Sequence, residues 1–284
     1  MEFNPALRAG LDRVNFKVPV STLSIDHSSN DIRAYVEEGL RYVEWDPSVK
    51  SEVRTRILDQ ANGNFLWVHL ILEEIKECHS DDDIRATLSE LPPGMEALYR
   101  RMETSISQRI RRPFDRRLSR QLFLWATYAR ESLTVEELAS ILEADFGRIL
   151  DMTSTLARLC GHFVVIEGDN RIGLLHQTAR EYLVSAEHLP FSLDANEAHE
   201  ELFQKSVCVF MGNNLRSRLS NVPESFSLFS YRATSWAYHL TAPSNGNTVD
   251  HQLDTLCKFF GDTAVLIWIQ VLSSLGQLGV LIDT

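Results

Sequence analysis

A mainly α-helical protein built around a winged helix is the fold class that the sequence predicts. Apolar residues recur at spacings of three and four along most of the chain, which is the period of amphipathic helices. A strand-turn-strand pattern occurs in one short region, directly after three such helices. The 284 residues suffice for one large domain or two to three small ones. With 44% hydrophobic and 24% charged residues, the composition is typical of a folded globular protein.

The first region begins with one strand-like segment and continues as a helix. Val18–Asp26 is short, rich in β-formers and bounded by polar residues, so a solitary strand is predicted there. From Asn30 the apolar spacing becomes helical, and Asn30 is placed to cap the first turn. The buried face of this helix is expected to carry Ile32, Val36, Leu40 and Val43.

Further helices follow one another closely. The Asp46-Pro47 pair is an N-cap followed by a first-turn proline, and the helix that it starts is expected to end near Gly63. Phe65–Cys78 predicts the next helix, and the acidic start at Asp81 favours another because negative charge stabilises a helix N-terminus. The clearest apolar stripe lies within Met95–Ile110.

The middle of the chain carries the winged-helix pattern. The three expected helices are Leu118–Ala129, a second that opens with the capping box Thr134–Glu137, and Asp151–Cys160. The expected hairpin and final helix are Phe163–Ile166, the turn Gly168–Asn170, Ile172–Leu175 and His176–Ser185. Three helices followed by a hairpin are typical of a winged helix.

The last region is predicted to be helical again, over Asp194–Met211 and Phe226–Leu240. Ala264–Ile282 is about as long as a membrane span, but Gln270 and Gln277 interrupt it and no basic residue flanks its C-terminal end. A helix or helix pair buried on both sides is therefore expected, and membrane insertion is not. Trp67, Trp125, Trp236 and Trp268 fall in apolar stripes and are expected in the core, as are His69 and His239 at its boundary.

No catalytic constellation is found in the sequence, so an enzyme is not expected. Gly168 and Gly173 have the glycine spacing of a phosphate loop, but leucines follow where Lys and Ser or Thr are needed. The GxSxG and HExxH patterns are absent, and the four cysteines have neither disulfide nor zinc spacing. They are expected to be buried thiols of a cytoplasmic protein, with no metal site. The net charge of −11 disfavours nucleic-acid binding.

An arginine run interrupts this acidic composition. Eight arginines and only two acids, Glu103 and Asp115, lie within Arg100–Arg120. A solvated helix face is one interpretation, because charge runs are usually exposed. The other is a docking surface for an acidic partner or for a nucleotide-bearing domain, and the sequence does not decide between them.

Six motifs in register resemble the region after the nucleotide-binding domain of fungal NACHT-type STAND NTPases, the NOD-like receptors of filamentous fungi. They are Asp31–Val36, Ala61–Val68, Leu91–Tyr99, Leu133–Leu138, Leu175–Leu183, and Tyr231–Trp236 with His239. The winged helix is also similar to the one labelled after the GPI inositol-deacylase. The resemblance implies the tail of a nucleotide-binding domain at 1–29, a helical domain at 30–112, the winged helix at 113–190 and a second helical domain at 191–284.

The resemblance also implies a function. In that family this region is a non-catalytic arm that keeps the ADP form closed, and a histidine that opens the last winged-helix helix contacts the phosphate; His176 stands at that place. A helix start and an imidazole N–H both favour an anion, although a purely structural capping histidine is the alternative. ADP or ATP is expected only in a fuller protein. Expected partners are the nucleotide-binding domain, C-terminal ankyrin or WD40 repeats and a homo-oligomer.

One family position does not match. Near the adenine the family has Gly-x-Pro-Leu, whereas this chain has Gly63-Asn64-Phe65-Leu66, so Phe65 is expected in the core and not at the nucleotide.

Three other functions stay open. The chain can be a stand-alone interaction scaffold or truncated gene product, the arm of a hydrolase, or a DNA-binding winged helix. The last is disfavoured because Arg158 is the one basic residue of the helix that would enter the groove, and Glu167 and Asp169 occupy the wing tip.

Overall fold

The computed structural model describes residues 25–185, 194–212, 229–242, 249–261 and 263–275. These residues are almost entirely helical, with one small three-stranded sheet, which confirms the predicted fold class. The contacts divide the chain into two compact units, Met1–Gly94 and Met95–Thr284. The domain boundaries that the resemblance implies, at 29, 112 and 190, remain predictions.

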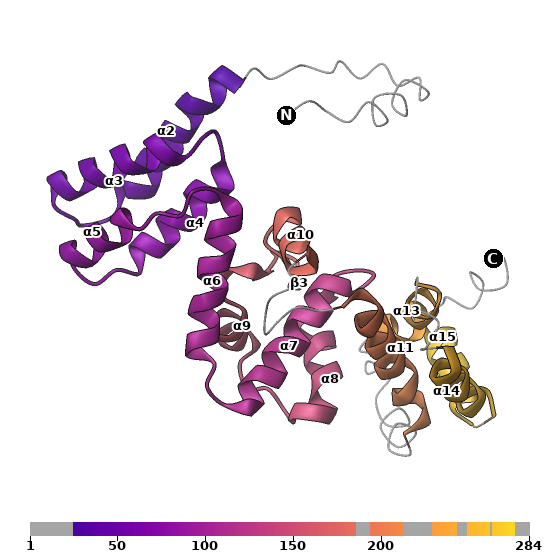
Figure 1. Ribbon diagram of the computed structural model, residues 1–284. Helices are drawn as coiled ribbons and strands as arrows, with labels where there is room; N and C mark the ends of the chain where they lie inside the picture. Colours follow the sequence, from indigo (N-terminus) through magenta and orange to yellow (C-terminus); the bar gives the residue numbers. More distant parts are fainter. Residues whose placement is uncertain (1–24, 186–193, 213–228, 243–248, 262, 276–284) are drawn as a thin grey trace, which may run out of the picture. The chain divides into compact units, whose positions relative to one another are not determined.

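The first unit is a set of short helices (Figure 1). They are α2 (Ile25–Arg41), α3 (Pro47–Gln60), α4 (Phe65–Lys76) and α5 (Asp81–Ser89). Helix α2 packs on α3 and α4, and α3 packs on α5. The predicted apolar stripe of α2 is buried at Ile32, Val36 and Leu40. Trp67 is also buried, and its indole N–H donates a hydrogen bond to the Pro92 carbonyl at 3.1 Å.

The start of α2 differs from the prediction. The helix begins at Ile25, so Asn30 lies inside it and does not cap it. Of the predicted strand, residues 18–24 lie outside the described residues, and the last two, Ile25 and Asp26, are helical. The start of α3 is as predicted, since the Asp46 carboxylate accepts a hydrogen bond from the Ser48 amide at 2.8 Å.

The second unit contains the winged helix. Helix α6 (Met95–Arg109) precedes it. The elements of the winged helix are α7 (Pro113–Tyr128), β1 (Leu133–Thr134), α8 (Val135–Phe146), α9 (Met152–Cys160), the short 3₁₀ helix η1 (Gly161–Phe163), β2 (Val164–Ile166), β3 (Arg171–Leu174) and α10 (Gln177–Ser185). The strand order is β1-β3-β2 with antiparallel pairing. Three helices followed by a hairpin are thus confirmed, and β1 adds an edge strand that the sequence did not predict.

Local sequence explains the start of α8 and the turn of the wing. The Thr134 hydroxyl accepts a hydrogen bond from the Glu137 amide at 3.1 Å, while the Glu137 carboxylate accepts one from the Thr134 amide at 2.9 Å. This is the predicted capping box. Asn170, at φ 64°, closes the turn between β2 and β3, because Asn tolerates the left-handed region better than most residues.

Four helices form a bundle at the C-terminal end of the described chain (Figure 1). They are α11 (Ala195–Met211), α13 (Ser230–Thr241), α14 (Val249–Gly261) and α15 (Ala264–Ser274). Their core includes Phe203, Phe259 and Trp236, and the Trp268 indole donates to the Ala233 carbonyl at 2.8 Å. Among the described residues no single helix is long and apolar enough to cross a membrane, although α14 and α15 together, bent by 79°, have that length and composition.

Two burial predictions are wrong in part. Phe65 is 41% exposed, because it is the first residue of α4 and only the edge of its ring meets Tyr35, at 6.0 Å between centroids. Of the cysteines, Cys160 is buried, whereas Cys208 and Cys257 lie on exposed positions of α11 and α14.

Candidate functional site

His176 lies directly before α10, and its side chain is exposed. Its backbone carbonyl accepts the hydrogen bond of the Ala179 amide at 3.0 Å, as an N-cap residue does. Its Nδ1 atom accepts a hydrogen bond from the Thr178 amide at 3.2 Å and lies 2.9 Å from the Thr178 hydroxyl. The imidazole therefore caps α10, and one of its nitrogen atoms is used in doing so.

These contacts determine which nitrogen of His176 carries the proton. An Nδ1 atom that accepts from a backbone N–H is unprotonated, so the neutral ring carries its proton on Nε2. The capping role and an anion-binding role are thus compatible, because they use opposite nitrogens of the same ring. An exposed Nε2–H beside a helix N-terminus is a donor suited to an anion.

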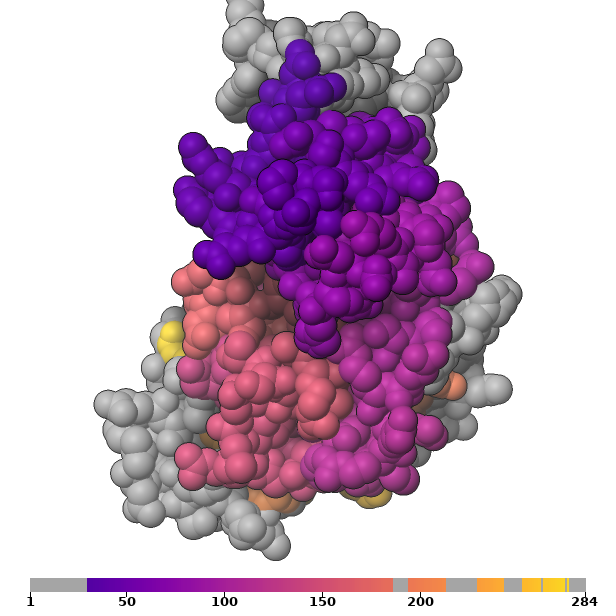
Figure 2. Space-filling view, turned by 90° about the vertical axis from the view of Figure 1, so that its left-hand side faces the viewer, coloured from indigo at the N-terminus to yellow at the C-terminus, as the bar shows by residue number. Residues whose placement is uncertain are grey.

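A cavity of about 270 Å³ adjoins His176. Its walls come from the end of α7, the segment before β1, strand β3 with Glu167 of the wing turn, and the start of α10. The polar and charged lining residues are Trp125, Arg130, Glu131, Ser132, Glu167, His176, Gln177 and Arg180. Residues of α10, coloured salmon, lie on the surface in the space-filling view (Figure 2).

Charged groups of both signs line this cavity, with Arg130 and Arg180 beside Glu131 and Glu167. The Trp125 indole N–H is buried and has no hydrogen-bond partner among the described residues, which is unusual for a buried donor. Arg180 follows His176 by four residues, so both lie on the same face of the first turns of α10. His176 and Arg180 are the donors that can meet an oxyanion here, because the Trp125 nitrogen is closed off from solvent. Glu131 and Glu167 are the acids of the lining, and they limit the positive charge that the cavity presents.

The sequence predicts His176 as a site residue but not the residues around it. Arg180 could have been found, because the helical period places it above His176. Arg130 and Trp125 could not, since they reach the cavity only through the packing of α7 against β3.

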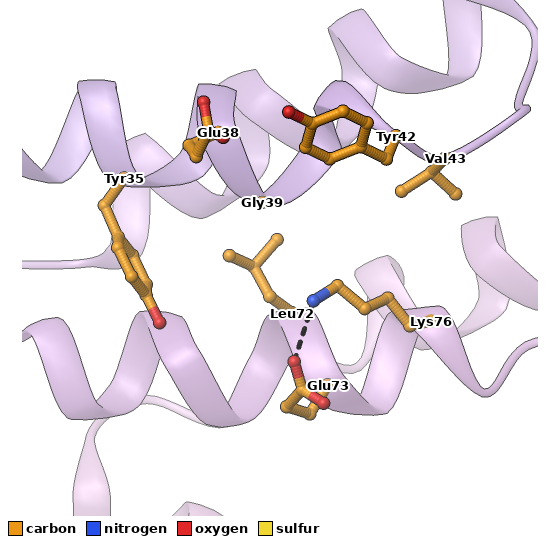
Figure 3. A pocket seen from close by; sticks show the side chains of 8 residues that line it. All are labelled: Tyr35, Glu38, Gly39, Tyr42, Val43, Leu72, Glu73 and Lys76. Carbon is orange, nitrogen blue, oxygen red and sulfur yellow. Dashed lines mark hydrogen bonds and ion pairs between the residues drawn. The ribbon is translucent and has the colours of Figure 1, made fainter.

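A second hollow lies between α2 and α4 and has a volume of about 540 Å³ (Figure 3). It is lined by Tyr35, Glu38, Gly39, Tyr42, Val43, Leu72, Glu73 and Lys76. A Cβ atom on Gly39 would lie 2.9 Å from the Leu72 Cδ1 atom, so the glycine permits the close approach of these helices. Lys76 donates to Glu73 at 2.8 Å, so the cation in this hollow is already paired and does not favour an anion there.

The arginine run is divided among several kinds of contact. Three members pair with carboxylates: Arg100 with Glu96 at 2.9 Å, Arg112 with Asp115 at 2.8 Å and Arg120 with Glu201 at 2.6 Å. Three others use uncharged groups: Arg109 donates to the Ser105 hydroxyl, Arg116 to the Ile110 carbonyl, and Arg117 lies over the Phe146 ring. The solvated-face and docking interpretations of the run both remain predictions.

The helix that would enter a DNA groove is α9. Its basic residue, Arg158, lies 3.3 Å from the carboxylate of Asp115, which Arg112 also contacts. Asp115 is buried, so this guanidinium is engaged in holding α9 against α7.

The other histidine predictions concern structure. His239 is 1% exposed, as expected of a core histidine, and His69 is half-buried and lies 2.9 Å from the Tyr35 hydroxyl. Within the described ranges, no group of three or more His, Cys, Asp or Glu side chains is placed to hold a metal ion.

Fold and site together define a helical protein with a winged-helix domain and a polar cavity beside α10, the last helix of that domain. Comparison with known proteins agrees: residues 106–198 match the family described as GPI inositol-deacylase, winged helix domain. Over 212 residues the chain is 26% identical to the vegetative incompatibility protein HET-E-1 of Podospora anserina. That match covers 70% of this chain and 15% of HET-E-1, so the chain corresponds to a small part of that relative.

Both matches support the resemblance to the winged-helix region of fungal NACHT-type proteins. No solved structure matches the chain.

Proposed function

We propose that this chain is the non-catalytic regulatory arm of a NOD-like receptor of the STAND class. In this proposal the arm controls the nucleotide-dependent opening and oligomerisation of a larger protein. The similarity to a vegetative incompatibility protein supports a role in non-self recognition. The nucleotide-binding domain and the C-terminal repeats of the same polypeptide are the partners, and that domain supplies ADP or ATP.

The observation that carries the proposal is the position of His176. Its Nε2–H is free of the capping bonds, at a helix N-terminus that adjoins a cavity lined by Arg180. A nucleotide phosphate held by a neighbouring domain would find donors here without any further change in α10. Hydrogen bonds to a charged group contribute about 1.5–3 kcal/mol, so one such contact changes an affinity by roughly 10- to 150-fold.

The mechanism follows from differential binding. A ligand shifts a conformational equilibrium only as far as it binds one state better than the other. If the phosphate touches His176 in the closed state alone, ADP stabilises that state, and loss of the contact releases the arm. Release would then expose surfaces that allow self-association.

The test uses the polypeptide that contains this chain together with its nucleotide-binding domain. The reading frame is expected to encode Gly-x4-Gly-Lys-Ser/Thr upstream of the chain. His176→Ala is expected to weaken ADP binding by about tenfold or more and to increase self-association in ADP. His162→Ala is the matched control, since His162 is an exposed histidine of the same winged helix that does not line the cavity. Unchanged ADP affinity and self-association in His176→Ala would contradict the proposed role.

A second candidate, a protein-interaction scaffold, is favoured by the outer face of the C-terminal bundle. Leu253 and Phe260 of α14 are 52% and 55% exposed, and Leu266 of α15 is 57% exposed. Exposed apolar groups of this size often belong to interaction sites. If the scaffold is the function, Leu266→Asp removes a protein partner while nucleotide has no effect on binding. If the arm is the function, nucleotide state changes self-association in the wild-type polypeptide.

A further inference from the structure

Two of the sequence motifs that carry the family resemblance meet in space. Tyr99, at the end of Leu91–Tyr99, lies on α6, and Thr178, within Leu175–Leu183, lies on α10. Their hydroxyl oxygens are 2.8 Å apart, although 79 residues separate them in sequence. The Tyr99 ring is buried and packs on Phe163 and Tyr182, each at 5.3 Å between centroids. The hydroxyl of Tyr99 is thus held in a fixed place beside α10.

The direction of these hydrogen bonds can be worked out from His176. Its Nδ1 atom accepts from the Thr178 amide, so it is unprotonated and also accepts from the Thr178 hydroxyl at 2.9 Å. The Thr178 oxygen is then free to accept from Tyr99. Burial raises the pKa of Tyr99, so its hydroxyl stays protonated and remains a donor. The protons therefore all point one way, from Tyr99 through Thr178 to His176.

We propose that Tyr99 and Thr178 are positioning residues for His176. Their hydroxyl relay holds the imidazole in the Nε2–H form and in one orientation, so that the donor faces an anion. This inference rests on the proposed function for the identity of the anion, a nucleotide phosphate, but not for the relay itself. Because Tyr99 lies on α6, the relay also links the occupancy of His176 to that helix.

The same two helices offer a matched control. The Tyr182 hydroxyl of α10 donates to the Glu103 carboxylate of α6 at 2.8 Å. This bond joins α6 to α10 as the Tyr99 bond does, and at the same length, but it does not touch His176. Tyr182→Phe therefore removes one hydroxyl bond between these helices and leaves the relay complete.

The experiment is ¹⁵N NMR of the histidine rings in the full chain at neutral pH, with His176→Gln to assign the His176 signals. The wild-type His176 ring is expected in the Nε2–H form. Thr178→Val is expected to lower the ratio of the Nε2–H to the Nδ1–H form roughly 2- to 12-fold, the factor that corresponds to one neutral hydrogen bond. Tyr99→Phe is expected to lower this tautomer ratio less. Thr178→Ser, which keeps the hydroxyl, and Tyr182→Phe are both expected to keep the wild-type ratio.

Two results would overturn the inference: a wild-type His176 in the Nδ1–H form, or a tautomer ratio that Tyr182→Phe changes as much as Thr178→Val does. Neither result depends on nucleotide. The proposed function fails separately, if His176→Ala leaves ADP affinity unchanged in the longer polypeptide while the tautomer responds to Thr178→Val as expected. The two ideas are thus tested by different measurements.

Discussion

The Nδ1 atoms of His199 and His239 lie 2.9 Å apart and join α11 to α13. The Tyr231 hydroxyl accepts from the Arg130 amide at 2.9 Å and lies 2.6 Å from Nε2 of His239. One of the two facing Nδ1 atoms carries a proton and the other accepts it, so a single hydrogen bond joins the two rings. Protonation of both rings would place two N–H donors against each other, so the hydrogen bond requires at least one neutral ring.

A loss of stability in mild acid follows from this pair. Burial, with His199 and Arg130 nearby, lowers the pKa of His239 to about 3, and burial with Arg180 lowers that of His199. In acid the folded state then binds fewer protons than the unfolded state. The contribution of these histidines to the free energy of unfolding is therefore fully present above the ordinary pKa of about 6.5 and is lost progressively as the pH falls below that value. His239 alone is expected to lower the free energy of unfolding by about 1.4 kcal/mol for each pH unit below 6.5.

Urea unfolding of the chain at pH 7 and pH 5 measures this effect. The free energy of unfolding of the wild type is expected to be lower at pH 5 than at pH 7. In His239→Gln, whose side chain does not titrate, this decrease is expected to be smaller by about 2 kcal/mol. His162→Gln, at an exposed position, serves as the control and is expected to keep the wild-type difference. An unchanged difference in His239→Gln would show that the pair does not govern acid stability.

Asp115 is predicted to stabilise the winged helix through its charge. Its buried carboxylate receives two hydrogen bonds from Arg112, at 2.8 and 3.0 Å, and one from Arg158 at 3.3 Å. The hydrogen bond from Arg112 lowers the pKa of Asp115, so this contribution is present above the ordinary pKa and is lost as the pH falls through the lowered one. Asp115→Asn is expected to cost about 1–3 kcal/mol at pH 7.

The control for Asp115 is Asp82→Asn. The Asp82 side chain is 97% exposed and pairs with Arg85 at 3.4 Å, so its loss is expected to cost less than about 0.5 kcal/mol. Equal losses of unfolding free energy in the two variants, measured with urea, would show that the burial of Asp115 does not strengthen its contribution to stability.

Gly161 is predicted to be required at the end of α9. Its φ of 55° is one that side chains rarely adopt, and a Cβ atom there would lie 3.2 Å from Ile106 Cδ1. Gly161→Ala is therefore expected to cost about 1–3 kcal/mol of backbone strain and a further amount from crowding. Gly147→Ala isolates the strain, because Gly147 has φ 71° but open space around it. If thermal unfolding shows equal losses for both, crowding at Ile106 is absent.

Local sequence was sufficient for much of the fold. The capping box at Thr134, the cap at Asp46 and the turn at Asn170 each depend on groups a few residues apart, and each appears as predicted or close to it. Strand β1 was missed because two residues carry no alternation, and their pairing is decided by β3 instead. The early start of α2 was missed because Asn30 matches an N-cap residue, whereas the helix begins five residues earlier, at Ile25.

The candidate site was less predictable. His176 was found from its resemblance to a family position and from its place before a helix. The hydrogen bonds that link His176 to Thr178, and Thr178 to Tyr99, were not predicted. The bond between Thr178 and Tyr99 joins residues 79 positions apart, which no local pattern reveals. Phe65 shows the opposite error: an apolar residue was expected in the core, but the first turn of α4 leaves it 41% exposed.

The most direct measurement is the affinity of residues 1–284 for the nucleotide-binding domain that the proposal joins to them. Calorimetric titrations would be made with that domain loaded either with ADP or with a non-hydrolysable ATP analogue. An arm that closes the ADP state is predicted to bind the ADP-loaded domain about tenfold or more tightly than the other, with the preference lost in His176→Ala. Equal affinities for the two loaded forms would contradict a nucleotide-dependent arm.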